Sequence, residues 1–172
     1  MSNQQNKTII LSSSNKIQEK LKRISKLDDF EIDYNNQLKL INQLFLEENL
    51  NENKSLIRLK REIEIKINGY KQQDIKKKLY DENLFIKLED IVEMIVSCKI
   101  KCYYCNSKMK IIYKYVRDNL QWTLDRIDNN DGHTKNNTLV CCLKCNLQRR
   151  CINKDKFDFT KKLSSTTIKK LD

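Results

Sequence analysis

Residues 123–146 read TLDRIDNNDGHTKNNTLVCCLKCN, and this stretch contains His133, the only histidine of the 172-residue chain. Two segments within or beside it are rich in β-prone residues, QWTL at 121–124 and TLVCC at 138–142. The NNDG sequence at 129–132 between them is a good turn. The pattern therefore predicts a strand, a loop and a second strand, which leads directly into a C-x-x-C motif.

Two C-x-x-C pairs bracket this region, Cys102 with Cys105 and Cys142 with Cys145. A two-residue spacer lets two thiolates of one tight turn reach a single tetrahedral ion, so two such turns predict a structural Cys₄ zinc site. Cys141 is the alternative to Cys142, but only Cys142 gives the two-residue spacer. Two redox dithiols are the other interpretation, and no evident βαβ pattern supports it.

Seven cysteines are an odd number, which does not suit a complete disulfide framework. The cysteines outside the pairs are expected to be buried or free thiols: Cys98, Cys141 and Cys151. The first ten residues are polar and lack a signal-peptide core, and no apolar run approaches membrane-spanning length. We therefore expect an intracellular protein with no membrane partner, in which zinc stabilises a small finger.

The positive charge of the chain is concentrated around the cysteines. The net charge is +11, and residues 98–172 hold 17 Lys/Arg against 7 Asp/Glu, whereas residues 1–97 hold 17 against 16. A concentrated basic region is typical of a protein that binds a polyanion, and a solvated basic surface is the alternative. Zinc with four thiolates would lower this charge by about 2.

The composition favours helices, because the chain has no proline and only two glycines. We expect an α+β fold with a mainly helical N-terminal half and a small zinc-stapled finger. Residues 108–116 (KMKIIYKYV) are β-prone, and residues 145–157 are expected to begin a helix. Four segments are predicted: a disordered 1–15, a helical region 16–97, a zinc module 98–160 and a basic tail 161–172.

Apolar residues recur at helical spacing in two runs of the N-terminal half: Leu38, Ile41, Leu44 and Phe45, then Leu56, Leu59, Ile63, Ile67 and Tyr70. Gly69 is expected to end the second helix. The sequences YKQQDIKKKLYD (70–81) and LEDIVEMIVSC (88–98) predict a third and a fourth helix. Two alternatives remain, since IEIKI (63–67) also alternates like a strand and the half as a whole could form a coiled-coil seam.

Between and after the cysteine pairs the chain reads LDRID, GH, NN and finally CLKCN, in this order. This order resembles that of the HNH endonucleases, the His-Me finger or ββα-metal superfamily. It is most similar to endonuclease VII-like and HNH restriction nucleases, whose finger is held by flanking C-x-x-C pairs. The resemblance covers about residues 99–151, under a third of the chain, and implies a ββα-metal finger.

The resemblance implies a catalytic role for Asp125, Asn146, His133 and Arg126. Asp125 would be the carboxylate ligand of a catalytic metal, and Asn146 would be its second ligand. Mg²⁺ or Mn²⁺ suits such oxygen ligands, whereas thiolates select the structural zinc. His133 would be the general base that takes a proton from the attacking water, and a third metal ligand is the alternative role.

The basic residues of the motif are expected to contact the substrate. Arg126 would bind the scissile phosphate, because its fork suits two oxygens, and Asn137 would brace the loop. Flanking phosphates would be bound by Lys144, Arg149 and Arg150. One departure from the family concerns Arg126, which occupies the position where many members carry the base histidine. A related arrangement places a base of another residue type at the loop position that His133 occupies here.

The resemblance implies a metal-dependent endonuclease that hydrolyses phosphodiester bonds of double-stranded or branched DNA. One finger holds one active site, so a monomer would nick, and double-strand cleavage would need a dimer, for which the helical N-terminal half is available. The alternative is a non-catalytic zinc module that binds nucleic acid or docks on an assembly. The Lys/Asn/Ile-rich composition is compatible with an AT-rich genome, such as that of a phage or a large DNA virus.

Overall fold

The computed structural model describes residues 29–48 and 53–165. The disorder expected for residues 1–15 lies outside this range, as does the end of the chain after residue 165. The elements follow one another as α1 (Asp29–Ile32), α2 (Tyr34–Phe45), α3 (Lys54–Lys77), α4 (Leu88–Ser97), β1 (Trp122–Arg126), the 3₁₀ turn η1 (Lys135–Asn137), β2 (Thr138–Cys142), α5 (Leu143–Arg149) and α6 (Lys154–Ser165). The predicted α+β class is confirmed.

Helix α3 is longer than the sequence pattern predicts. It runs for 24 residues through Gly69, so the expected stop at this glycine is wrong, and residues 70–77 continue the same helix. The IEIKI segment is helical as well. Tyr70 and Asp74, which follow the glycine in α3, are both buried. Their tertiary packing outweighs the cost of about 1 kcal/mol for a glycine inside a helix. The helix ends at Lys78, whose left-handed backbone has φ 60°.

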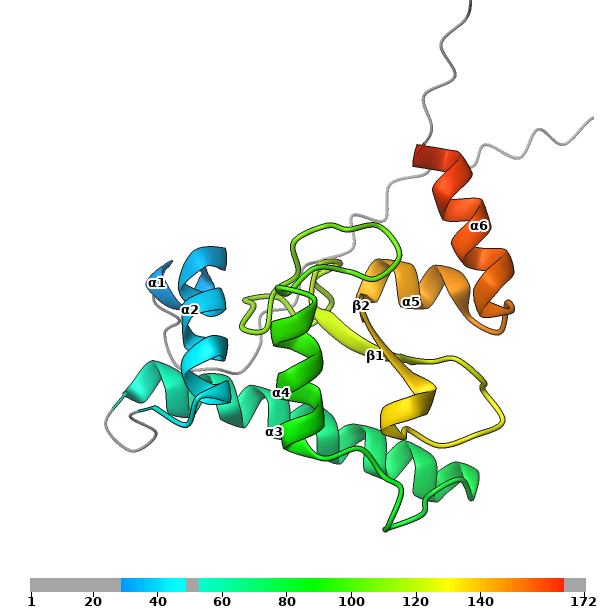
Figure 1. Cartoon of the computed structure of the whole chain (residues 1–172), viewed down its shortest axis with the longest axis horizontal. Helices are drawn as coiled ribbons and strands as arrows, with labels where there is room; N and C mark the ends of the chain where they lie inside the picture. The colour runs from blue at the N-terminus through cyan, green and yellow to red at the C-terminus, as the bar shows by residue number, and fades with distance from the viewer. Residues whose placement is uncertain (1–28, 49–52, 166–172) are drawn as a thin grey trace, which may run out of the picture.

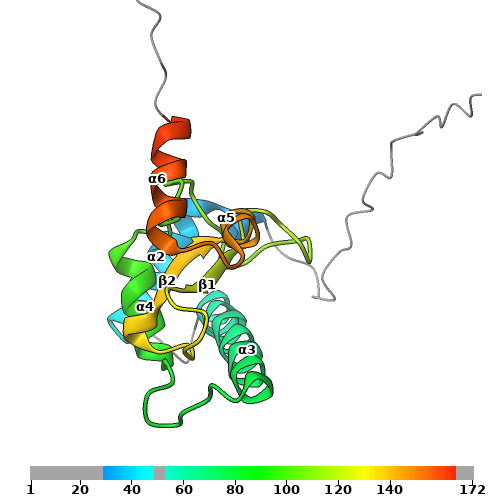
Figure 2. The same cartoon turned by 90° about the vertical axis from the view of Figure 1, so that its right-hand side faces the viewer.

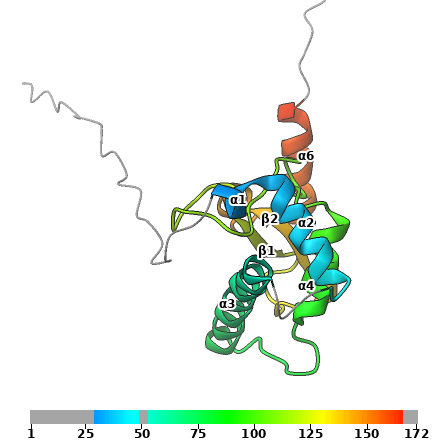
Figure 3. The ribbon, with the colours of Figure 1, turned by 90° about the vertical axis from the view of Figure 1, so that its left-hand side faces the viewer.

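The helical half packs as a layer rather than as a coiled coil. Helix α2 contacts both α3 and α4, and α4 spans the predicted fourth helix almost completely. Figure 1 shows α1 and α2 at the end of the molecule away from α6, and Figure 3 shows them above α3. One hydrophobic core joins this layer to the finger, with Leu59, Ile95 and Trp122 all fully buried in the same cluster.

The two strands form an antiparallel hairpin with Trp122 opposite Cys142 and Arg126 opposite Thr138. The second strand has the predicted bounds, whereas the first overlaps the predicted 121–124 and continues to Arg126. The β-prone segment 108–116 does not form a strand, and only isolated bridges involve it. Gln37 of α2 explains the difference, because its side chain accepts from the amides of Ile111 and Ile112 and donates to the carbonyl of Ile112. The Gln37 side chain thus forms hydrogen bonds with backbone groups that would otherwise pair with a neighbouring strand.

The hairpin lies between α3 on one side and α5 with α6 on the other, as Figures 1 and 2 show. The helix expected over residues 145–157 is two helices, because the chain turns at Arg150, whose φ is 50°. Helix α6 then extends five residues into the predicted basic tail, to Ser165. No helix in the described part of the chain combines the length and the apolar character that crossing a membrane requires.

Candidate functional site

Four cysteines form a compact cluster that could hold a zinc ion. The Sγ atoms of Cys102, Cys105, Cys142 and Cys145 all lie within 4.8 Å of one another. The Cys105 and Cys142 sulfurs are 3.8 Å apart, which matches the edge of about 3.8 Å of a tetrahedron with Zn–S bonds of about 2.3 Å. The prediction that the two C-x-x-C turns, here called knuckles, come together in one cluster is therefore confirmed. The donor set and its spacing fit structural zinc and leave no reason for two separate redox pairs.

Backbone contacts shape this cluster. The amide of Tyr103, inside the first knuckle, donates to the carbonyl of Val140 on β2, so the knuckle is fixed to the hairpin. The Cys142 amide donates to the Cys102 sulfur at 3.3 Å. The side-chain hydrogen bond from Cys142 lowers the pKa of Cys102 to about 5, against the opposing effect of burial. The lowered pKa of Cys102 favours the thiolate form that binding a metal would require.

The remaining cysteines lie outside the cluster, as predicted. Cys141 is buried beside Thr123, whose hydroxyl donates to the Cys141 carbonyl at 3.0 Å. Burial raises the pKa of the Cys141 thiol well above its usual value. Cys98 is partly exposed and Cys151 is exposed. Cys141 therefore stays a protonated core residue rather than a ligand.

A first polar cluster surrounds Asp125 on the α5 side of β1. One carboxylate oxygen of Asp125 accepts from the Tyr104 hydroxyl at 2.7 Å, and the other accepts from Arg149 Nη1 at 2.6 Å. Arg149 also donates to the carbonyls of Arg126 and Ile127 at 2.6 and 2.7 Å. Its side chain is only 1 % exposed and contacts protein groups, so in this arrangement it does not face the solvent from which a flanking phosphate would approach. The guanidinium is instead the counter-ion of Asp125.

Asn146 joins the same cluster from the first turn of α5. Its amide donates to Thr123 Oγ1 at 3.1 Å and to the Leu124 carbonyl at 3.0 Å. Thr123 and Asp125 are two positions apart on β1 and therefore face the same side. A carboxylate and an amide from neighbouring elements are donors of the kind that Mg²⁺ prefers, so the donor chemistry fits a divalent cation. Arg149 competes with such a cation for Asp125.

A second polar cluster lies on the α3 side of β1. His133 Nδ1 is 2.8 Å from Asp74 Oδ1, and the His133 backbone amide donates to Asp74 Oδ2 at 2.7 Å. Arg126 Nη1 is 3.9 Å from the same Asp74 Oδ1 and donates to the Asp131 carbonyl at 3.0 Å. The Tyr70 ring stacks on the imidazole at 4.7 Å. His133 and Arg126 are thus together, whereas Asp125 and Asn146 lie across the strand.

The environment of His133 favours its neutral form. Burial lowers the pKa of His133, the hydrogen bond and charge of Asp74 oppose this, and the Arg126 charge lowers the pKa further. The net pKa lies below the usual 6.5. An unprotonated imidazole at neutral pH has one ring nitrogen free to accept a proton.

The loop between the strands is held by Asn137. Its amide donates to the carbonyls of Asp128 and Gly132 at 3.0 and 2.9 Å, and its oxygen accepts from the Asp128 amide at 2.9 Å. Gly132 packs so closely on the end of α3 that an added Cβ would lie 2.5 Å from the Leu79 carbonyl oxygen. The loop that carries His133 is therefore fixed both internally and against α3.

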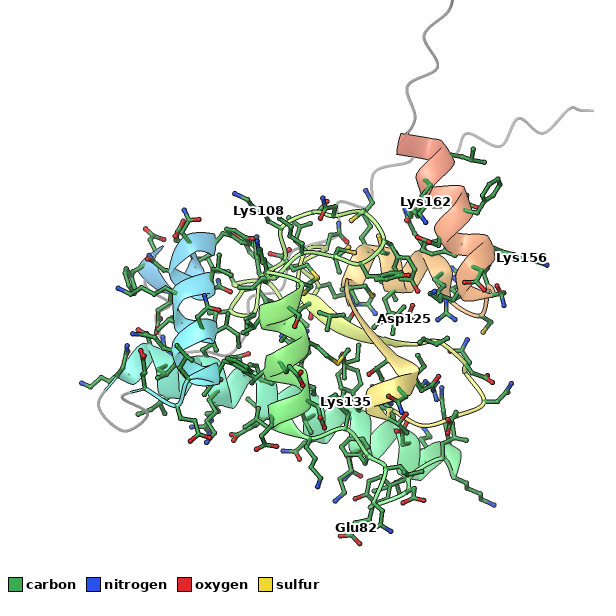
Figure 4. The ribbon with its side chains drawn as sticks, in the orientation of Figure 1. Glu82, Lys108, Asp125, Lys135, Lys156 and Lys162 are labelled. Atoms are coloured by element: carbon green, nitrogen blue, oxygen red, sulfur yellow. The ribbon has the colours of Figure 1, made fainter. Side chains whose placement is uncertain are left out.

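Exposed basic side chains lie beside these clusters. Lys144 and Arg150, at the two ends of α5, are exposed. Figure 4 shows Lys156 and Lys162 projecting from α6, while Asp125 lies inside, between the hairpin and α5. The exposed basic side chains of this region thus include Lys144, Arg150 and lysines of α6, whereas Arg149 is buried.

Sequence reasoning missed Asp74, Tyr70 and Tyr104 as members of the two clusters. Asp74 follows Tyr70 by one helical turn and therefore continues the buried stripe of α3. A carboxylate on an apolar stripe was the available signal. Tyr104 lies in the spacer of the first C-x-x-C pair, where its identity carries no spacing information.

Comparisons with protein-family models, with curated proteins and with solved structures gave no match.

Proposed function

We propose that the protein is a metal-dependent endonuclease that hydrolyses phosphodiester bonds of double-stranded or branched DNA. One observation carries the proposal: Asn146 from the first turn of α5 donates to Thr123, which faces the same side of β1 as Asp125, and the second strand of this hairpin leads into the Cys₄ cluster. The single histidine of the chain lies in the loop of the same hairpin. The strand, strand and helix order is that of a ββα-metal finger.

The side chains supply the groups that phosphodiester hydrolysis needs. Asp125 and Asn146 would hold Mg²⁺ or Mn²⁺, which would act as a Lewis acid on the phosphate. His133, neutral at pH 7, takes the proton of the attacking water. Arg126 follows Asp125 in the chain and lies with His133 on the α3 side of β1, where it would stabilise charge on the phosphate.

The basic surface serves DNA binding in this proposal. Lys144 and Arg150 flank α5, and α6 adds further lysines. Contacts between such side chains and the phosphate backbone of DNA do not read the DNA sequence, and they weaken steeply as the salt concentration rises. A monomer makes one nick, and a dimer formed through the helical half would cut both strands. An intracellular location and a phage or viral source are expectations that are compatible with this proposal.

A non-catalytic zinc module that binds nucleic acid or docks on an assembly is the second candidate. The observation in its favour is burial, because His133, Asp125 and Arg126 are only 3 %, 4 % and 7 % exposed. Each of the three also has a hydrogen-bond partner within the protein. Side chains with these contacts would stabilise a finger even if they never touched a substrate.

Cleavage of DNA distinguishes the two candidates. The zinc-loaded protein is incubated with supercoiled plasmid and with a four-way junction, in Mg²⁺, in Mn²⁺ and in EDTA. Asp125→Asn is compared with Glu82→Gln, a matched carboxylate-to-amide change at an exposed position away from Asp125 (Figure 4). We expect metal-dependent nicking by the native protein and by Glu82→Gln and a loss of at least 100-fold in Asp125→Asn. DNA binding without cleavage of either substrate would instead establish the non-catalytic module.

A further inference from the structure

Asp74 contacts His133 through both oxygens of its carboxylate. One oxygen is 2.8 Å from the ring nitrogen Nδ1, and the other accepts from the backbone amide of the same histidine. The Asp74 side chain is 1 % exposed, so water does not compete for these bonds. The carboxylate thereby fixes both the backbone of the loop and the rotation of the imidazole.

The contact also selects the tautomer of the imidazole. A carboxylate only accepts hydrogen bonds, and a neutral imidazole carries one N–H. The proton therefore belongs on Nδ1, and the basic lone pair is on Nε2. A neutral imidazole held in this way is ready to accept a proton at a defined atom.

The rest of the environment is built around this pair. Tyr70, one turn before Asp74 on α3, stacks on the imidazole, and its hydroxyl accepts from the Leu124 amide at 2.9 Å. Gly132 lets the loop approach α3, since an added Cβ would lie 3.3 Å from Asp74 Oδ2 as well as close to Leu79. The contact of Tyr70 with the imidazole and the close approach of Gly132 to Asp74 and Leu79 both join the helical half to the finger.

We propose that Asp74 is a positioning residue for His133, so that α3 of the N-terminal half completes the active site of the finger. This inference rests on the endonuclease proposed above. Asp74 does not touch the substrate; it holds Nδ1–H so that Nε2 receives the proton from water. The helical half then contributes to the reaction itself, besides any role in dimerisation.

Asp74→Asn separates positioning from simple anchoring of the loop. The amide oxygen of asparagine still accepts from the His133 backbone, but its NH₂ group faces Nδ1 and donates to it. The ring proton must then move to Nε2, which removes the basic lone pair. Because a positioned base contributes about 10²–10⁴-fold, we expect nicking by Asp74→Asn to fall by that factor with unchanged KM for DNA.

The lone histidine makes the tautomer directly measurable. ¹⁵N NMR of the imidazole in the zinc-loaded full chain reports one residue, His133. We expect the Nδ1–H tautomer in the native protein and in Glu82→Gln, and the Nε2–H tautomer in Asp74→Asn. In the native protein the acid limb of the pH–rate profile should also coincide with the pKa of His133 in the same NMR titration, a test that needs no variant to fold.

The outcomes separate this inference from the proposed function. Absence of nicking by the native protein would overturn the endonuclease and the role of Asp74 together. Nicking by native protein with an Nε2–H imidazole, or undiminished nicking by Asp74→Asn, would overturn the role of Asp74 alone. So would an acid limb that does not follow the titration of His133.

Discussion

At the scale of single residues, Arg149 is the clearest departure from expectation. An arginine in a basic region is ordinarily exposed, yet this side chain bridges Asp125 and two backbone carbonyls at the end of β1. The three contacts offset the cost of removing a guanidinium from water. Arg149 thereby ties α5 to the hairpin and balances the charge of a buried carboxylate.

Loss of Arg149 should be far more costly than loss of its neighbour. Arg149→Met leaves Asp125 buried without a counter-ion, which we expect to lower the free energy of unfolding by about 3–5 kcal/mol. Arg150→Met, at an exposed position, should change it by less than about 0.5 kcal/mol. Urea denaturation of the zinc-loaded variants measures both. Equal effects would mean that the pair with Asp125 does not stabilise the fold.

His133 gives the stability a defined dependence on pH. Its pKa is lower in the folded chain than the unfolded value of 6.5, chiefly because of burial and despite Asp74. Between the two values the unfolded chain binds more protons, so stability falls as pH drops through 6.5 toward the folded pKa. Urea denaturation from pH 8 to pH 5 should show this loss in the native protein and a smaller loss in His133→Gln. Parallel curves would show that His133 does not titrate differently on folding.

At the scale of elements, the sequence predicts local features better than distant ones. The cysteine spacing and the strands at 121–124 and 138–142 depend on neighbouring residues, and the structure agrees with both. The strand expected at 108–116 fails because Gln37, more than 70 positions away, binds its backbone. The Asp74–His133 pair joins residues 59 positions apart, so no local pattern reveals it.

The two glycines of the chain should respond to alanine in opposite directions. Gly69 lies exposed inside α3 with nothing within 4 Å of an added Cβ, so Gly69→Ala should stabilise by about 0.5–1 kcal/mol. At Gly132 the Cβ would meet the Leu79 carbonyl, so Gly132→Ala should destabilise by about 1–3 kcal/mol. Thermal denaturation compares the pair directly. A neutral Gly132→Ala would contradict the close packing of the loop on α3.

At the scale of the whole molecule, the finger and the helical layer share one core. Buried residues of α2, α3 and α4 belong to the same hydrophobic cluster as Trp122, Val140 and three cysteines of the Cys₄ cluster, Cys102, Cys142 and Cys145. A two-stranded sheet is marginal by itself, so we expect the hairpin to depend on the helices and on zinc at the Cys₄ cluster. The two halves should therefore unfold as one cooperative unit.

Removal of zinc should weaken the entire fold. Cys105→Ser removes one ligand, whereas Cys151→Ser changes an equally exposed cysteine outside the cluster. We expect zinc loss and a lower Tm in Cys105→Ser only, with helical circular dichroism and the fluorescence of buried Trp122 changing in the same transition. Two separate transitions would show that the helical layer folds without the finger.

The approach of Gly132 to Leu79 has a consequence for inheritance. A recombination event or an engineered graft that moved residues 98–151 into another protein would carry all four cysteines of the Cys₄ cluster together with Asp125 and Asn146. It would leave behind α3 and Leu79, on which the loop packs at Gly132. It would also leave behind Asp74, whose carboxylate contacts the ring of His133. The finger is therefore not transferable by itself, and the helical half of the chain must be inherited together with it.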